Sequence, residues 1–233
     1  MNSSIPWREH RVTLVRSNRK TIALHVSQGV IEIRAPMQAS QAFISQFLKE
    51  KEPWLEKTLQ HQQVLEQDRI DYSRAAHIPF MGINVPLIRK TDTSNRWQLV
   101  KQGLQLTVRD HEDAEQILNT LESFYKAQAH YWLTRKTTET ARQANLFKRL
   151  KDVRLRRTKT KWGHCTSEGR IQYNWQIMMA PEAVIDYLVA HEVSHLRHMN
   201  HTTDFWRTVE SLHQSFKQDR EWLHQNGHRL QLR

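Results

Sequence analysis

Cysteine is nearly absent from this chain of 233 residues, which contains only Cys165. An intramolecular disulfide is therefore excluded, and the sequence predicts a protein of a reducing compartment, the cytoplasm. No apolar run approaches the roughly 18 residues that a membrane span requires. The first residues also lack the apolar stretch of a secretory signal, so we expect neither export nor a membrane segment.

Glycine is scarce as well, with six residues, and the chain has no internal repeat, low-complexity tract or Gly/Ser linker. Hydrophobic residues make up 38% and charged residues 25% of the sequence, which is typical of a folded globular protein. The formal net charge of +11 predicts attraction of anions: nucleic acid, nucleotides or acidic protein segments. Solubility through net charge is the alternative explanation of the same excess.

The first half of the chain has mainly the patterns of β-strands. Short alternating or β-branched segments between turn residues predict strands at 12–15, 21–26, 30–33, 83–88, 97–100 and 104–108. A change to helical spacing predicts one helix over about 40–60 with a bend at Pro53, followed by a polar connection over 61–76.

The second half has mainly helical patterns. Apolar residues at helical spacing over about 112–146 predict one long amphipathic helix or two in sequence. A strand pair is expected at 153–161 and 170–178, and a further helix begins at Pro181 and runs to about Met199. We predict an α+β fold with a β-rich region containing one helix over residues 1–110, followed by a region with a small sheet and helices over 111–233.

The stretch that indicates chemistry is His191-Glu192-Val193-Ser194-His195. In a helix, residues four apart differ by about 40° and rise about 6 Å, so both imidazoles can bind a single ion. Glu192 projects beside them, where a carboxylate can act on a metal-bound water. The surrounding residues Ile185, Leu188, Val189, Val193 and Leu196 form a continuous apolar stripe, which supports a helix rather than a chance motif.

A catalytic zinc site needs a third protein ligand, and His198 and His201 compete for that role. In a regular helix His198 would lie two turns from His191, about 10.5 Å along the axis, and could not share an ion with it. Asn200 tolerates the left-handed conformation that ends helices, so a break there would turn His201 back toward the first two ligands. The sequence therefore favours His191, His195 and His201.

A longer series of motifs accompanies this helix. It comprises Lys161-Trp162-Gly163-His164-Cys165-Thr166, Gly169-Arg170-Ile171, Asn174-Trp175, Ala180-Pro181, Val184-Ile185-Asp186-Tyr187-Leu188-Val189, Asn200-His201 and Phe205-Trp206. Together these motifs resemble the YgjP-like metallopeptidases, relatives of the SprT-like zinc proteases. The N-terminal Arg34-Ala35-Pro36 and Pro53-Trp54 are also similar to the family, so the resemblance covers most of the chain. It implies a zincin-like catalytic region over 111–233, with His201 as the third zinc ligand.

One position departs from that family, which usually has Trp-Gly-Ser-Cys where this chain has His164 in place of serine. His164 is a candidate donor to the substrate, although a loop histidine bound to a backbone carbonyl is the more common case. Cys165 is a candidate nucleophile or fourth ligand, but a lone cysteine beside a strand is more often a small buried hydrophobe.

Basic residues alternate along the candidate strand 153–161, at Arg154, Arg156, Arg157, Lys159 and Lys161. If this strand borders the cleft, its charge would attract an anionic substrate or a nucleic acid backbone, with Arg157 on the substrate side. An edge strand that its charges protect against edge-to-edge pairing is an equally good interpretation.

The leading prediction is a zinc-dependent hydrolase that cleaves peptide or protein substrates with one Zn²⁺ per chain. Zinc lowers the pKa of its water toward about 7, and Glu192 takes the proton as general base. Two alternatives stay open: a metal-dependent nucleoside triphosphate pyrophosphatase, and a nucleic-acid-binding module with a structural zinc. In zincin-like enzymes a peptide pairs with a sheet edge, which 153–161 or 170–178 would offer here.

Overall fold

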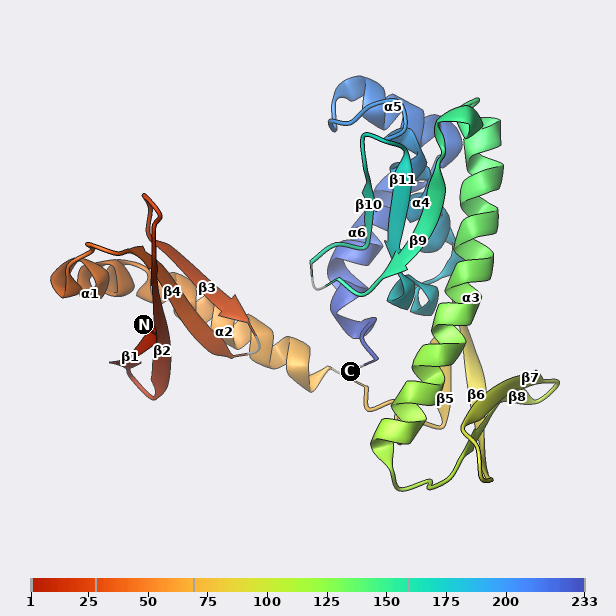
Figure 1. Ribbon diagram of the computed structural model, residues 1–233, viewed down its shortest axis with the longest axis horizontal. Coiled ribbons are helices and arrows are strands. Elements are labelled where there is room, and N and C mark those ends of the chain that lie inside the picture. Colours follow the sequence, from red (N-terminus) through yellow and green to blue (C-terminus); the bar gives the residue numbers. More distant parts are fainter. Residues whose placement is uncertain (1, 28, 69, 159, 233) are drawn as a thin grey trace. The chain divides into compact units, whose positions relative to one another are not determined.

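The computed structural model describes residues 2–27, 29–68, 70–158 and 160–232, with the backbone alone for residues 2, 61, 65 and 66. Contacts divide the chain into two compact units, residues 1–69 and residues 70–233 (Figure 1). This division differs from the expected boundary at 110/111, because the strands between 77 and 108 belong to the second unit. As a division of function, the boundary at 110/111 stays a prediction. The fold class is α+β, as predicted.

The first unit is a four-stranded sheet packed against two helices. Its elements are β1 (Asn2–Trp7), β2 (His10–Ser17), β3 (Ala23–Ser27), β4 (Val30–Pro36), α1 (Gln41–Glu50) and α2 (Glu52–Gln67). The strand order is β1-β2-β4-β3, with β2 and β4 parallel and the other pairs antiparallel. Alternate residues of β2 and β4 are buried against Ile44, Leu48 and Leu55 of the helices, so the unit has a core of its own.

The structure corrects two sequence predictions in this unit. The helix expected over 40–60 is two helices that break at Lys51, because Pro53 is favourable in the first turn of a new helix and unfavourable inside a continuing one. The second helix continues through the expected polar connection to Gln67, since its Gln, Glu and Leu residues favour helix. β1 was not predicted: it is polar and contains Pro6, which an edge strand tolerates.

The second unit begins with another four-stranded sheet, formed by β5 (His77–Phe80), β6 (Ile83–Thr91), β7 (Arg96–Val100) and β8 (Gly103–Val108). Its order is β5-β6-β8-β7, with β6 and β8 parallel and the other pairs antiparallel. This is the same order and the same set of strand directions as in the first unit. Each sheet is followed directly by helix, so the chain repeats one β-sheet plan that its sequence does not reveal.

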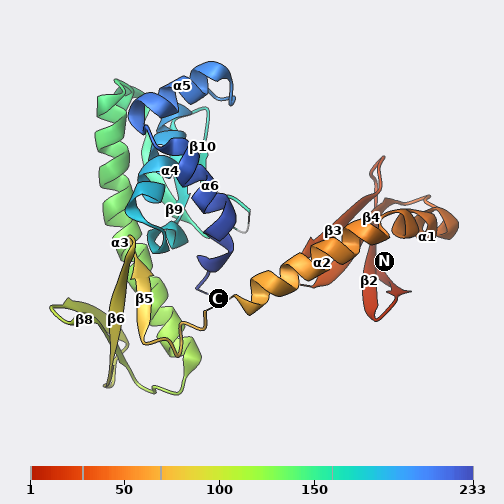
Figure 2. The ribbon, with the colours of Figure 1, turned by 180° about the vertical axis from the view of Figure 1, so that it is seen from behind.

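α3 (Ala114–Gln143) links this sheet to the rest of the second unit. It matches the predicted helix over 112–146, and Asp113 caps its start by accepting hydrogen bonds from the backbone N–H groups of Glu115 and Gln116. The helix packs on β7 and β8 at one end and on β9 (Asp152–Arg156) and α4 (Glu182–Ser194) further along (Figures 1 and 2). None of the helices in the described part of the chain combines the length and apolar character that crossing a bilayer requires.

The second unit also contains a three-stranded sheet in the order β10-β11-β9, with α3 packed on β9 and α4 packed on β10. The remaining elements are β10 (Gly163–Cys165), β11 (Arg170–Asn174), the 3₁₀ helices η1 (Phe147–Arg149), η2 (Trp175–Met179) and η3 (Gly227–Arg229), and the helices α5 (Thr203–Leu212) and α6 (Phe216–Asn226). β9 and β11 are parallel, whereas β10 and β11 form an antiparallel hairpin. Apolar residues of α3, α4, β11 and η2 make one large core.

Several predictions for this region differ from the structure, and the strand expected over 153–161 ends at Arg156. The expected strand 170–178 ends at Asn174, whose side chain caps η2 by accepting from the backbone N–H of Gln176. β10 was not predicted because a strand of three residues has no detectable alternation. α4 ends at Ser194 rather than near Met199, and Asn200 has no positive φ, so the expected left-handed break there is wrong.

The turn between β10 and β11 generates a test of packing. Gly169 has φ +83° and lies against the backbone of Arg149, so that a Cβ would sit 1.9 Å from the Arg149 carbonyl oxygen. We expect Gly169→Ala to lower the free energy of unfolding by about 2–4 kcal/mol, measured by urea denaturation.

Gly82→Ala is the matched control for Gly169→Ala. Gly82 lies in the same unit with φ +84°, but its Cβ would meet no atom closer than 3.4 Å. We expect this variant to lower the free energy of unfolding only by the cost of a left-handed backbone at alanine, about 1–2 kcal/mol. Equal losses in the two variants would show that the close approach to Arg149 does not matter.

Candidate metal centre

Three histidines converge at the end of α4. His191 and His195 lie in its last turn and at its C-cap, and His201 lies in the segment between α4 and α5. One ring nitrogen from each histidine lies within 4.8 Å of the others, and the Nε2 atoms of His191 and His201 are 3.2 Å apart. The structure therefore brings together the three residues that the sequence analysis favoured as ligands.

His198 contributes to this group through its backbone rather than its ring. The carbonyl oxygen of His198 lies 2.9 Å from Nδ1 of His195. When Nδ1 carries the proton and donates to this carbonyl, Nε2 of His195 keeps its lone pair for a metal ion. This contact supports the sequence-based choice of His201 over His198 as the third ligand.

Aromatic residues of α5 form the floor beneath the three imidazoles. Phe205 is fully buried, with its ring centroid 4.6 to 5.0 Å from those of His191, His195 and His201. Trp206 lies beside Phe205, 5.8 Å from the ring of His191 and 5.7 Å from that of His201. Because these rings fill the space behind the imidazoles, they hold the imidazole orientations and exclude water from that side.

Glu192 is buried next to the histidines, with 3% of its surface exposed. Its Oε2 has no hydrogen-bond partner among the described residues. Burial raises the pKa of Glu192 to about 8, although the positive charge of Lys161 acts in the opposite direction. A buried carboxyl group without a partner is costly, so it is most readily explained by a ligand that completes the site.

Glycine at position 163 allows Glu192 to occupy this place. A Cβ added to Gly163 would lie 2.2 Å from Oε1 of Glu192, so β10 and α4 approach each other too closely for any side chain. The Trp162-Gly163-His164 segment therefore passes directly over the carboxyl group. In the sequence this glycine stands out only as part of a family motif, and no local pattern indicates its contact with Glu192.

The chemistry of these groups fits a divalent metal. Burial, together with the positive charge of His195, His201 and Arg220, lowers the pKa of His191 to about 3, so that its imidazole is neutral and can act as a ligand. Its Nδ1 is buried and has no hydrogen-bond partner in the part of the chain that the structure describes, and its Nε2 faces that of His201. Among the described residues the group has three members, which fits a catalytic zinc site with one open position.

The two substrate-side candidates lie in different places. His164 is exposed on β10, next to Gly163, and its charge contributes to lowering the pKa of His195, after the larger effects of burial and of His201. It therefore lies at the edge of the metal group without being part of it. Arg157 is exposed beyond the end of β9, and no described contact joins it to the histidines, so its predicted role stays a prediction.

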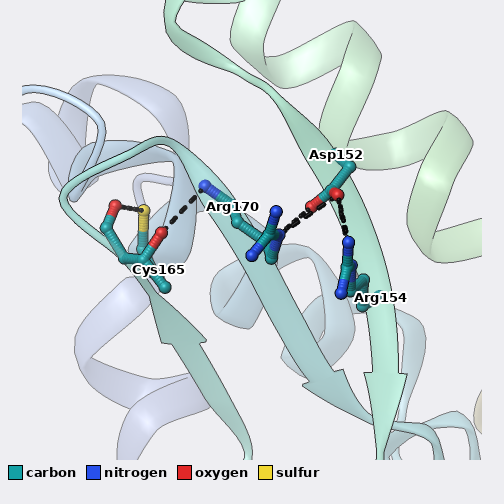
Figure 3. Close-up of polar contacts among 5 residues, drawn as sticks. Asp152, Arg154, Cys165 and Arg170 are labelled. Carbon is teal, nitrogen blue, oxygen red and sulfur yellow. Dashed lines mark hydrogen bonds and ion pairs between the residues drawn. The ribbon is translucent and has the colours of Figure 1, made fainter.

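The basic strand β9 is partly neutralised (Figure 3). Arg154 and Arg170 both bind the carboxylate of Asp152, at 3.0 Å and 2.9 Å. Lys159 lies outside the described residues. β9 is an edge strand of its sheet, so its arginines agree better with protection of that edge than with a substrate channel.

Cys165 is buried on β10, with its Sγ 3.5 Å from the carbonyl oxygen of Thr166 (Figure 3). Burial and the nearby Glu192 raise the pKa of this thiol to about 12. The thiol does not belong to the group of possible metal ligands, so its environment agrees with the predicted buried hydrophobe rather than with a nucleophile.

The environment of Cys165 predicts slow reaction with thiol reagents. We expect native protein to react with Ellman's reagent at least about a hundredfold more slowly than urea-unfolded protein, since both exposure and thiolate fraction are reduced by folding. Cys165→Ser supplies the background signal. Labelling of the native chain at the unfolded rate would contradict the burial described here.

Comparison with known proteins agrees with this geometry. The sequence profile described as "YgjP-like, metallopeptidase domain" matches residues 20–226, nearly the whole chain. A comparison with curated individual proteins found no match. The matched range contains the three histidines, Glu192 and the Gly163 segment. The chain therefore belongs to the YgjP-like metallopeptidase domain family.

Proposed function

We propose that this protein is a zinc-dependent metallopeptidase that binds one zinc ion through His191, His195 and His201 and uses Glu192 as general base. The observation that carries the proposal is the placement of three imidazole nitrogens within 4.8 Å of one another, beside a buried carboxyl group whose Oε2 has no partner among the residues described. Membership of a metallopeptidase family supports hydrolysis as the reaction class.

Glu192 has the surroundings that a general base requires. A bound zinc ion would supply an activated water and polarise the substrate carbonyl. Glu192 would take up a proton from the attacking water and deliver it to the leaving amine, and its burial makes it a stronger base than an exposed carboxylate. Gly163 fixes the position of the carboxyl group, because β10 lies against its Oε1.

The same strand provides a surface for an extended peptide. β11 is paired on both sides, so the expected edge at 170–178 is wrong, and β9 lies at the opposite edge from α4. β10 is the edge that adjoins α4, with Gly163 against Glu192. We propose that a substrate peptide pairs with the free edge of β10 and thereby places its scissile bond beside Glu192.

Turnover of an unfolded protein tests the proposed reaction. Wild-type protein should cleave an unfolded protein substrate such as reduced casein, and removal of metal by a chelator should abolish this activity. Glu192→Gln should lower the rate by at least about a hundredfold while it keeps the fold and the bound zinc.

The assay runs in parallel with nucleoside triphosphates and with DNA. If only nucleotides were hydrolysed, and this hydrolysis depended on Glu192 and on metal, the protein would be a phosphoanhydride hydrolase rather than a peptidase. DNA binding without any turnover would favour a structural zinc. Equal protein cleavage by wild-type and Glu192→Gln would identify a contaminating protease.

Zinc binding tests the proposed ligands. After dialysis against zinc, wild-type protein should hold one zinc ion per chain, and His201→Ala should hold none or bind it much more weakly. His198→Ala is the matched control and should keep the ion, because His198 contributes only its backbone carbonyl.

Zinc content is measured by atomic emission, and thermal denaturation provides an independent readout. A ligand at a hundred times its Kd stabilises the folded state by about 2.7 kcal/mol, so zinc should raise the Tm of the wild type and of His198→Ala. Zinc loss in His198→Ala together with retention in His201→Ala would exchange the roles of these two residues.

A further inference from the structure

Exposed basic side chains surround the metal centre. Besides the larger effect of burial, the charge of Lys161 acts to lower the pKa of Glu192. His164 and Arg220 of α6 act in the same direction on the pKa values of His195 and His191. All three of these basic residues are exposed.

Arg220 is the most firmly positioned of these cations. Its guanidinium lies 4.8 Å from the ring centroid of Trp206, in a cation–π contact. The ring of Trp206 in turn lies 5.7 Å from the ring of His201. It also stacks on Phe216, which precedes Arg220 by one helical turn, and the planes of the Trp206 and Phe216 rings are 18° apart. The indole ring thus connects the arginine to a metal ligand and fixes its location relative to the centre.

The acidic neighbours of Arg220 are occupied elsewhere. Asp219 accepts hydrogen bonds from Ser215 at 2.7 Å and lies 2.6 Å from Nε2 of His213. Glu221 accepts from Gln225. These contacts point the carboxylates along or behind α6, and within the described residues no hydrogen bond or ion pair involves the guanidinium of Arg220, which is exposed.

The Ser215, His213 and Asp219 cluster is not a second catalytic site. Both Ser215 and Asp219 contact the same nitrogen of His213, so the histidine cannot relay a proton from the serine to the aspartate. The cluster instead fixes the start of α6, which packs on α4. It thereby holds Arg220 beside α4, the helix that presents His191 and His195 and is called here the metal helix.

We propose that Arg220 binds a carboxylate of the peptide substrate, an inference that rests on the proposed peptidase function. A guanidinium supported on an aromatic ring presents a planar fork that matches a carboxylate. Arg220 lies over Trp206, next to His201, whereas Glu192 lies against Gly163 of β10, so the arginine and the general base face different parts of the site. Because Trp206 separates it from the ligands, Arg220 recognises a group that flanks the scissile bond.

Binding of defined peptides tests this proposal without turnover. The protein is the zinc-loaded Glu192→Gln variant, and the probes are fluorescein-labelled alanine-rich peptides with one Glu placed at each position in turn. Matched peptides carry Gln instead of Glu, and a further pair ends in a free carboxylate or an amide. These arms distinguish a side-chain carboxylate from a terminal one.

We expect one acidic position to bind about tenfold more tightly than its Gln counterpart, and Arg220→Gln to remove this difference. Arg220→Lys should restore only part of it, since an ammonium lacks the planar fork. Arg220→Glu should prefer a Lys peptide. Lys217→Gln, which removes a charge from the same helix, is the control and should keep the preference.

Two failures can be told apart. Equal binding of Glu and Gln peptides, and of acid and amide ends, would overturn the role of Arg220, while Glu192-dependent cleavage of casein would leave the peptidase intact. A carboxylate preference that survives Arg220→Gln would also overturn the proposal. Absence of any Glu192-dependent cleavage would instead overturn the proposed function on which the inference rests.

Discussion

The contact between Gly163 and the carboxyl group of Glu192 is the constraint on which the site depends. It requires β10 to cross α4 with no side chain between them, and it places the edge of a sheet beside the metal helix. A larger residue at position 163 would displace either the strand or the carboxyl group. The sheet, the metal helix and the proposed base are therefore arranged by one close approach.

The sequence revealed the parts of the site that local geometry determines. His191, Glu192 and His195 were identified because helical spacing places them together whatever surrounds the helix. His201 was chosen for a partly wrong reason: the helix ends at Ser194 and no left-handed residue forms at Asn200. The exclusion of His198 agrees with the structure, in which only the backbone of that residue serves the site.

The parts that the sequence did not reveal depend on contacts between distant segments. Arg220 follows His201 by nineteen positions, and nothing in its neighbourhood marks it as part of the site. Likewise, the sequence does not show that the two four-stranded sheets share one strand order. Such a sheet requires only alternating apolar residues and turns, and two unrelated sequences can both provide these. Short β10 was missed for the same lack of a local signal.

Arg149 contacts both the turn between β10 and β11 and the chain just after α4. Its backbone carbonyl lies against Gly169 in the turn between β10 and β11, and its side chain donates to the carbonyl of Leu196, just beyond the metal helix. A displacement of that turn would therefore act on the chain that follows α4 and carries His201. Substitutions in this surface hairpin are accordingly expected to alter the geometry of the three imidazoles.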